Sequence, residues 1–421
     1  MKTILSLALQ SLRGRALTAS MTVLSIALSV GLLLGLEKVR TGTRASFAGT
    51  ISGTDLVVGA RSGPLQLLLY TVFHIGAPTA NVDYDTYLKY RDHPDVKWAV
   101  PLSLGDSHRG YRVIGTTQDY FRHYRYRAGN QLEFAEGGPP EDLFDATIGA
   151  EIARKLGYKI GRKLVLAHGI SAQGIRDHGD RPFVVTGVLE STGTPVDRGI
   201  FVSLEGIAAM HVDWQSGVPA PKSERLSIEE VRATDLATEE VTAFLVGARK
   251  RLLSLRLQRE INTDESEPLL AVLPGVVLAE FWRTIGYGER ALLIVSAMVV
   301  VVGLIGMFMA LYSTLEERRR EIAVLRALGA RPRDVLFLFL FEAMVLVIAG
   351  ILLGAALAYG GLLAFRPLLE QASGIYVPVP PPGMLEWIYM GAVLVAGVLA
   401  GALPAWKAYR NTLSDGLRTR M

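Results

Sequence analysis

The residues best suited to bond-making chemistry are either missing from this sequence or wrongly spaced. The chain has no cysteine, which excludes disulfides, thiolate metal sites and cysteine nucleophiles. A phosphate-binding loop needs G-x-x-x-x-G-K-[ST], and the stretch from Gly157 to Lys163 imitates that motif with the wrong spacing. Neither H-E-x-x-H nor G-x-S-x-G occurs. We therefore expect a non-catalytic chain that binds no cofactor, so any ATP it depends on must be bound by another polypeptide.

The histidines raise the question of a metal site. All seven lie in the segment between the first two apolar runs: His74, His93, His108, His123, His168, His178 and His211. That segment holds most of the polar chain, so chance explains much of the clustering. The spacings also match no metal-ligand motif. We expect no metal site, with metal-linked transport as the less favoured alternative.

Charge is concentrated in one short loop, residues 316–334. Between Glu316 and Arg333 there are six arginines and three glutamates, a net charge of +3. Ile322, Leu325 and Leu328 share one face of a short helix that Gly329 is placed to stop. Pro332 is placed to start the next segment. Such a helix could present its face to a cytoplasmic partner, or its arginines could simply contact lipid headgroups.

One carboxylate, Glu342, lies inside an apolar run. An ionisable residue in a membrane span is expensive and usually functional. We favour pairing of Glu342 with Arg326, Arg331 or Arg333, which would fix the loop, over a proton-relay role.

Four apolar runs are long enough to cross a membrane: residues 16–36, 290–315, 335–365 and 387–406. A cleaved signal peptide is the alternative for the first run, but the run is too long and lacks a clean cleavage pattern.

Arginine and lysine residues indicate the orientation of these runs. They lie just before the first run, within the 316–334 loop and just after the fourth run. The positive-inside rule therefore places both termini and this loop in the cytoplasm. The net charge of +4 and pI near 9.1 give no reason to expect a nucleic-acid partner.

These runs divide the chain. We expect a large extracytoplasmic α+β domain at 37–289, with a composition shift that suggests a second lobe around 205–265. Predicted strands are 55–58, 111–114, 163–167, 183–189 and 200–203, and predicted helices are 84–92, 149–156 and 204–211. The remaining parts are an amphipathic amino-terminal helix (1–15), a short outer loop (366–386) and a cytoplasmic tail (407–421).

Two further patterns suggest contacts. The apolar run 65–75 is too short to span a membrane. It could be a core helix, or Leu68, Leu69, Val72 and Phe73 could meet an apolar substrate or the outer leaflet. Gly31 and Gly35 form a G-x-x-x-G pair that permits close helix approach, so we place a dimer seam on the first span.

Residues 317–330, E-R-R-R-E-I-A-V-L-R-A-L-G-A, closely resemble the loop after the second span in the MacB/FtsX-type permease family of ABC transporters. The amino-terminal stretch from Leu7 to Arg15, the acidic Glu342 and the ending from Pro404 to Arg410 agree with that resemblance.

The resemblance implies a multi-pass protein of the bacterial inner membrane whose large domain is periplasmic. It implies a homodimer, or a heterodimer with a similar permease, bound to two copies of a separate ATP-binding subunit that holds ATP and Mg²⁺. The functions that the resemblance implies are export, lipoprotein extraction or mechanotransmission. Further implied partners are a periplasmic adaptor or substrate-delivery protein and membrane lipids. The residues that it assigns to the ATPase contact are Glu317, Arg318, Glu321, Leu325, Arg326, Leu328, Gly329 and Ala330. The alternative is a membrane-bound sensor or scaffold whose outer domain binds a ligand and signals through the loop.

Overall fold

The computed structural model describes residues 15–168, 181–215, 218–219, 226–317, 324, 327, 329–373 and 379–411. The chain forms two compact units. The first, called the membrane unit below, comprises Met1–Thr43, Ile285–Leu368 and Val377–Met421. The second, called the outer unit, comprises Arg44–Thr284 and Leu369–Tyr376.

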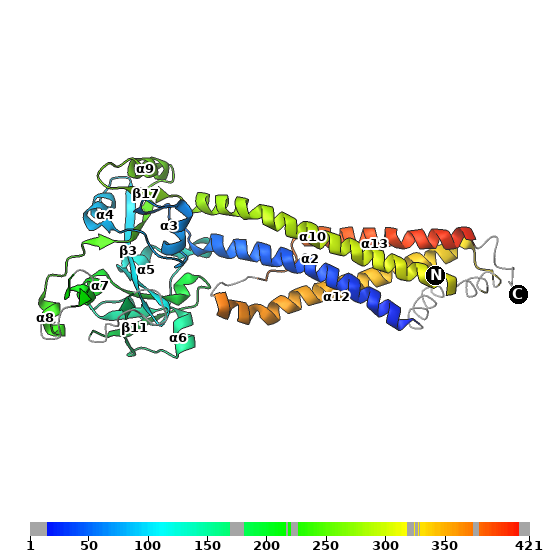
Figure 1. Ribbon diagram of the computed structural model, residues 1–421, viewed down its shortest axis with the longest axis horizontal. Coiled ribbons are helices and arrows are strands. Elements are labelled where there is room, and N and C mark those ends of the chain that lie inside the picture. The colour runs from blue at the N-terminus through cyan, green and yellow to red at the C-terminus, as the bar shows by residue number, and fades with distance from the viewer. Residues whose placement is uncertain are drawn as a thin grey trace. The chain divides into compact units, whose positions relative to one another are not determined.

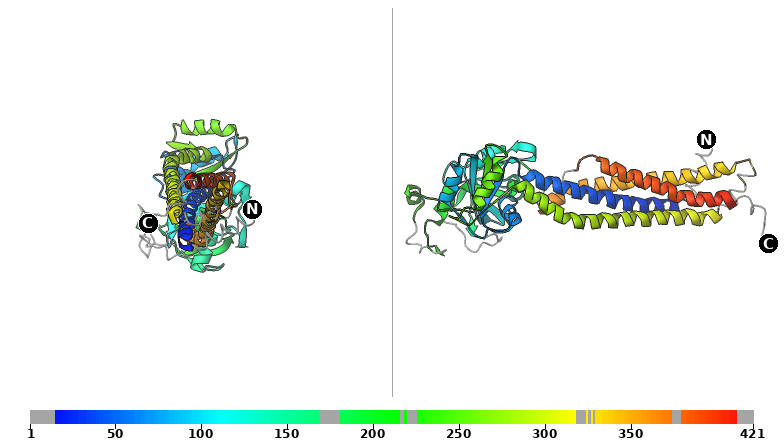
Figure 2. Two further views of the ribbon diagram at one scale, coloured as in Figure 1. Left: turned by 90° about the vertical axis from the view of Figure 1, so that its right-hand side faces the viewer. Right: turned by 90° about the horizontal axis from the view of Figure 1, so that it is seen from above.

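Four long apolar helices confirm the predicted spans. They are α2 (Ala16–Thr50), α10 (Pro274–Glu317), α12 (Pro332–Ser373) and α13 (Met384–Asn411). Each contains a window apolar enough to cross a membrane, with mean hydropathy between 2.0 and 2.8. The helices lie side by side in both Figure 1 and Figure 2. Helix α2 continues fourteen residues past the predicted end of its span at residue 36, to Thr50.

Small residues bring these helices together. A Cβ on Gly354 of α12 would lie 2.7 Å from the Ala27 carbonyl oxygen of α2, and one on Gly397 of α13 would lie 2.5 Å from Val347 of α12. Ser29 of α2 donates a 3.2 Å hydrogen bond to the carbonyl of Val299 on α10. Such close backbone approaches and interhelical hydrogen bonds are what hold helices together in lipid, where hydrophobic burial provides no drive.

The outer unit is built on one mixed sheet of eleven strands in the order β17-β1-β16-β3-β4-β12-β8-β11-β7, with β10 on β3 and β9 on β11. Most neighbours are antiparallel, but β12 runs parallel to β4 and β11 runs parallel to β8. The strands are β1 (Leu56–Ala60), β3 (Val96–His108), β4 (Tyr111–Thr116), β7 (Phe134–Gly137), β8 (Asp145–Ile148), β9 (Lys163–Leu164), β10 (Ala167–His168), β11 (Phe183–Leu189), β12 (Gly199–Ser203), β16 (Ala243–Ala248) and β17 (Leu269–Val272). Three short pairs lie outside the sheet: β2 (Val82–Asp83) with β15 (Glu240–Val241), β5 (Arg125–Tyr126) with β6 (Asn130–Gln131), and β13 (Trp214–Gln215) with β14 (Val218–Pro219).

Short helices pack on this sheet and confirm the predicted α+β character. They are α3 (Pro64–Thr71), α4 (Tyr84–Arg91), α5 (Asp119–His123), α6 (Ala150–Leu156), α7 (Leu204–His211), α8 (Ile228–Ala233) and α9 (Leu253–Asn262), with 3-10 turns η1 (Arg127–Gly129) and η2 (Pro195–Arg198). The predicted strand 183–189 is β11, and the predicted helix 204–211 is α7. Ser203 caps α7 by accepting a hydrogen bond from the amide of Gly206.

Residues 205–265, which the composition shift suggested as a second lobe, contribute to the same sheet. Strand β16 lies between β1 and β3, inside the sheet, and Phe244 on that strand is fully buried. Burial rather than composition decides this placement, because β16 is an uninterrupted apolar strand covered on both faces.

Candidate functional site

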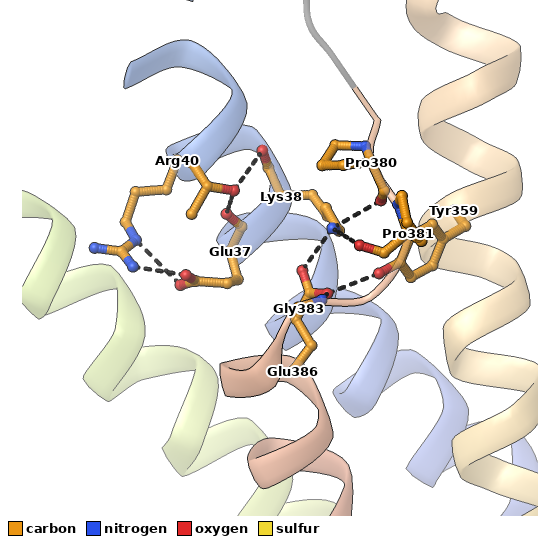
Figure 3. Close-up of polar contacts among 9 residues, drawn as sticks. Glu37, Lys38, Arg40, Tyr359, Pro380, Pro381, Gly383 and Glu386 are labelled. Carbon is orange, nitrogen blue, oxygen red and sulfur yellow. Dashed lines mark hydrogen bonds and ion pairs between the residues drawn. The ribbon is translucent and has the colours of Figure 1, made fainter. Parts of the chain in front are cut away.

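A buried polar cluster lies at one end of the apolar stretches, within the membrane unit. Lys38 of α2 is 3.0 Å from Glu386 in the first turn of α13, and both side chains are at most 5% exposed. Lys38 is twenty-two residues past Ala16, or about 33 Å at 1.5 Å per residue. Since a bilayer core is about 30 Å thick, the pair is expected near the membrane boundary where α2 leaves its span. Figure 3 shows how it joins three helices.

Glu386 accepts bonds from three different elements. Besides the Lys38 ammonium, it accepts a 2.8 Å hydrogen bond from the Tyr359 hydroxyl of α12 and a 2.7 Å bond from the amide of Gly383. Gly383 immediately precedes α13, so the carboxylate satisfies a backbone amide that the start of a helix leaves without an intrahelical partner. The buried carboxylate therefore has a cation and two hydrogen-bond donors as partners, as a buried polar group requires.

Lys38 uses all three of its donors. Its ammonium also contacts the carbonyl oxygens of Pro380 at 2.9 Å and Pro381 at 3.2 Å, and it lies 5.2 Å from the centre of the Tyr359 ring. The run Pro380–Pro382 has no backbone N–H groups, so its segment cannot form a ladder of its own and its carbonyls are available to the lysine. One cation thus fixes α2, α13 and the connection between α12 and α13.

A second pair links α2 to α10. Arg40 holds the carboxylate of Glu37 in a two-point contact at 2.6 and 3.1 Å, and its other terminal nitrogen lies 3.7 Å from Glu289 of α10. Glu37 is 3% exposed. The two clusters together connect all four spans at the level of residues 37–40 of α2. We call the side chains of both clusters the outer latch. They are Glu37, Lys38, Arg40, Glu289, Tyr359 and Glu386.

Beyond the latch, α2 and α10 enter the core of the outer unit. Residues 44–50 of α2 and 274–284 of α10 belong to that unit. Phe47 of α2 lies 4.8 Å from Phe73 and 5.6 Å from Trp282 of α10, measured between ring centres. The Tyr124 hydroxyl donates a 2.5 Å bond to the carbonyl of Thr50, the last residue of α2. Both helices are therefore continuous from the apolar spans into a packed aromatic cluster.

Comparison with known proteins assigns the family. Residues 19–243, more than half of the chain, match the MacB-like periplasmic core domain, and residues 293–413 match the FtsX-like permease C-terminal domain. The chain belongs to the MacB/FtsX-type permease family of ABC transporters. It is accordingly a multi-pass membrane protein whose outer unit is an extracytoplasmic MacB-like domain.

Curated relatives of this permease are longer than it is. The macrolide export ATP-binding/permease protein MacB of Bdellovibrio bacteriovorus is 33% identical over 97% of this chain and 60% of its own length. The pyoverdine export ATP-binding/permease protein PvdT of Pseudomonas savastanoi pv. phaseolicola is 25% identical over 79% of this chain and 48% of its own length. Among solved structures, the periplasmic region of MacB from Actinobacillus actinomycetemcomitans covers 55% of this chain and 94% of its own. Its TM-score is 0.34 at 8% identity, too low to bear on function.

Most residues predicted to contact the ATPase lie outside the described part of the permease: Arg318, Glu321, Leu325, Arg326 and Leu328. Glu317 is the last residue of α10. Gly329 has φ +98°, the left-handed conformation in which a glycine ends a helix, and Ala330 follows it. Pro332 is the first residue of α12, as predicted. The ATPase contact itself stays a prediction.

Glu342 of the permease is buried, at 1% exposure, within α12. Of its predicted partners, Arg326 lies outside the described residues, so the loop-fixing role stays a prediction.

The dimer seam predicted on the first span stays a prediction, and its two glycines differ in their surroundings. A Cβ on Gly31 would lie 3.3 Å from the carbonyl oxygen of Gly354 on α12 of the same chain, so its open face is already covered. Gly35 has no other described atom within 4 Å of such a Cβ and is the part of the motif still open to a partner.

The surface role suggested for the run 65–75 does not fit the burial of most of its residues. Leu68, Val72 and Phe73 are at most 5% exposed in the same core cluster that receives Phe47, and Leu69 packs against it half-buried. The core alternative fits: one face of α3 is buried, and Phe73, just past its end, packs against Phe47 of α2.

The described histidines take structural roles. His108 contacts the Val165 carbonyl at 2.7 Å and the Tyr158 hydroxyl at 3.0 Å, and His93 lies 3.3 Å from Glu260. Burial, with a smaller effect of the neighbouring Arg112, lowers the pKa of His74 to about 3. Within the described residues, no group of three histidine or carboxylate side chains is placed to hold a metal ion. His178 lies outside these residues.

Sequence reasoning missed the outer latch. Glu37, Lys38 and Glu386 lie at the edges of apolar runs, where charged residues are usually assigned to loops. The sequence could have indicated the contact, because a lysine just after the first span and a glutamate just before the fourth are expected at the same depth in the membrane.

Proposed function

We propose that this chain is the permease subunit of an ABC transporter, in which a separate ATP-binding subunit drives movement of the outer unit. The observation that supports this proposal is the continuity of α2 and α10. Each helix runs without interruption from a membrane span into the aromatic cluster around Phe47 and Trp282. A displacement of either helix in the membrane is therefore applied directly to the core of the outer unit.

The outer latch supports the same proposal. It holds α2, α10, α12 and α13 together at one level, so that the four helices move as a group at that end. A buried, fully hydrogen-bonded ion pair favours one defined arrangement over loosely packed alternatives. The driving force would enter at the opposite end, through the loop at 316–334.

The partners follow from this scheme. We propose two permease copies, as a homodimer or with a similar permease, two ATP-binding subunits that hold ATP and Mg²⁺, and cytoplasmic termini in a bacterial inner membrane. The names of the relatives describe macrolide and pyoverdine export. For this chain we propose that movement of the outer unit drives export, lipoprotein extraction or mechanotransmission. A periplasmic adaptor or delivery protein would act with it.

Co-purification tests the proposal. The tagged chain, expressed in its native host, should retain an ABC ATP-binding subunit, and Leu328→Asp should abolish that retention because the substitution places a charge on the apolar face of the loop. Ala327→Asp is the matched control, since helical spacing places Ala327 away from the predicted apolar face of Ile322, Leu325 and Leu328, and Ala327 is exposed. If the wild-type chain purifies without any ATP-binding subunit, the sensor or scaffold alternative takes precedence.

A further inference from the structure

The membrane unit contains an apolar groove that the packing of its four helices leaves open. It has a volume of about 560 Å³ and lies between α12 and α13. Its lining comprises Ile348, Ile351, Leu352, Ala355, Ala356, Tyr359, Pro382, Trp387, Met390, Gly391 and Leu394. The Tyr359 hydroxyl, bound to Glu386, is the polar group at one end.

The groove lies between two levels at which α12 and α13 meet, one of them the Tyr359–Glu386 hydrogen bond. They are in closest contact where Gly397 meets Val347 and Gly401 meets Ala343. Toward Tyr359 and Trp387 the small residues Ala355, Ala356 and Gly391 leave the space between the helices unfilled. No other described atom lies within 4 Å of a Cβ built on Gly391. A group bound in this hollow would regain the dispersion contacts that unfilled apolar space forfeits.

The dimensions of the groove identify its occupant. From Ile348 to Tyr359 it follows α12 for eleven residues, which is about 16 Å. One leaflet of a bilayer core is about 15 Å thick, half of about 30 Å. The groove ends beside the outer latch, so it lies in the leaflet on the extracytoplasmic side. At that end it carries Trp387 and Tyr359, the residue types that collect at headgroup level.

We infer that this groove binds one acyl chain of a phospholipid from the outer leaflet. The apolar walls match a hydrocarbon chain along its whole length, and Trp387, which is 61% exposed, marks where the glycerol and headgroup leave the groove. A helix of a second copy is the poorer fit, because a helix with side chains is about 10 Å across and α12 and α13 are in direct contact at the closed end of the groove. The bound chain would contact Tyr359, and through it the Glu386 carboxylate of the outer latch.

Lipid retention tests this inference. The full chain is reconstituted in liposomes of phosphatidylethanolamine and phosphatidylglycerol, extracted in mild detergent, and analysed by native mass spectrometry. We expect one retained phospholipid per chain. Gly391→Phe should reduce that adduct at least about tenfold, since the ring fills the groove and displaces two or more methylenes of the chain.

The control variant is Ala392→Phe, which adds the same side chain at the next residue, an exposed position outside the groove lining. It should retain the lipid. Ala356→Leu, a milder filling of the same groove, must reproduce the loss, which guards against misfolding of the phenylalanine variant.

Three results would overturn the inference: equal adducts in wild type and Gly391→Phe, an adduct whose mass is that of an acylated protein instead of a phospholipid, and loss of a dimer in the filled variants with no change in bound lipid. The last result would make a second copy the occupant. None of these results bears on whether an ATP-binding subunit co-purifies, so the inference and the proposed function fail separately.

Discussion

Lys38 shows how a single charged residue can be stable where lipid replaces water. Three acceptors surround its ammonium: the Glu386 carboxylate and the carbonyls of Pro380 and Pro381. A buried ion pair contributes little compared with well-packed apolar residues, but removing one partner leaves an uncompensated charge and costs about 3–5 kcal/mol. The main effect of the pair is therefore to fix how the helices are arranged, and its net contribution to stability is small.

We accordingly predict that Lys38→Met lowers the thermal stability of the detergent-solubilised chain strongly, because Glu386 loses its cation. Adding Glu386→Gln should restore most of that loss, which a double-mutant cycle measures. Arg283→Met is the control: its partner Glu280 is on the same helix, both are mostly exposed, and the change should stay within about 0.5 kcal/mol. Additive effects of the two latch substitutions would contradict the pairing.

His74 gives a second prediction at this scale, concerning pH. Burial holds its folded pKa near 3, below its ordinary value of 6.5. Below pH 6.5 the unfolded chain binds a proton that the folded chain does not, so stability falls as pH drops, by at most about 1.4 kcal/mol per unit. His74→Asn keeps a residue that tolerates the observed φ of +57° and should flatten this dependence between pH 6.5 and 5. Denaturant unfolding at several pH values measures it, and an unchanged slope would exclude His74 as the cause.

At the scale of elements, the membrane unit depends on glycines at helix crossings. Gly354 of α12 lies against the backbone of α2. Gly360, less than two turns further along the same helix, has no other described atom within 4 Å of where a Cβ would lie. Gly354 and Gly360 are thus glycines of the same helix, but only Gly354 is packed against another described helix.

We predict that Gly354→Leu forces α2 away from α12 and destabilises the chain by about 1–3 kcal/mol, the usual cost of overpacking. Gly360→Leu should be nearly neutral. Melting temperatures of the two variants in detergent make the comparison, and equal shifts would mean that α2 and α12 do not meet at Gly354.

For the whole molecule, the question is how motion in one unit reaches the other. The structure offers two continuous helices whose ends share an aromatic cluster with Phe73 of the outer core. Replacing Phe47 and Trp282 should uncouple the units without touching the spans or the cytoplasmic loop.

On the proposed function, we predict that Phe47→Ala with Trp282→Ala leaves ATP hydrolysis by the proposed complex within about twofold of wild type but abolishes the proposed ATP-dependent movement of the outer unit. Because the chain lacks cysteine, two introduced cysteines can carry labels for distance measurements without further changes. Val276→Ala, on the same helix as Trp282 and 60% exposed, should leave the movement intact. Persistent movement in the double variant would show that coupling takes another route.

By itself, the sequence determined the parts that depend on local composition. Uncharged runs longer than a bilayer predicted four spans, and β-branched segments predicted strands such as β11, because each of these properties belongs to neighbouring residues. It did not predict β3, a thirteen-residue central strand, since Pro101 in its middle argues against such a strand. Only the tertiary structure decided the outer latch, the covered face of Gly31, the burial of Leu68 and the open groove beside Gly391. Each of these depends on which residues, far apart in the chain, meet when helices pack, and pairwise packing leaves no trace in local composition.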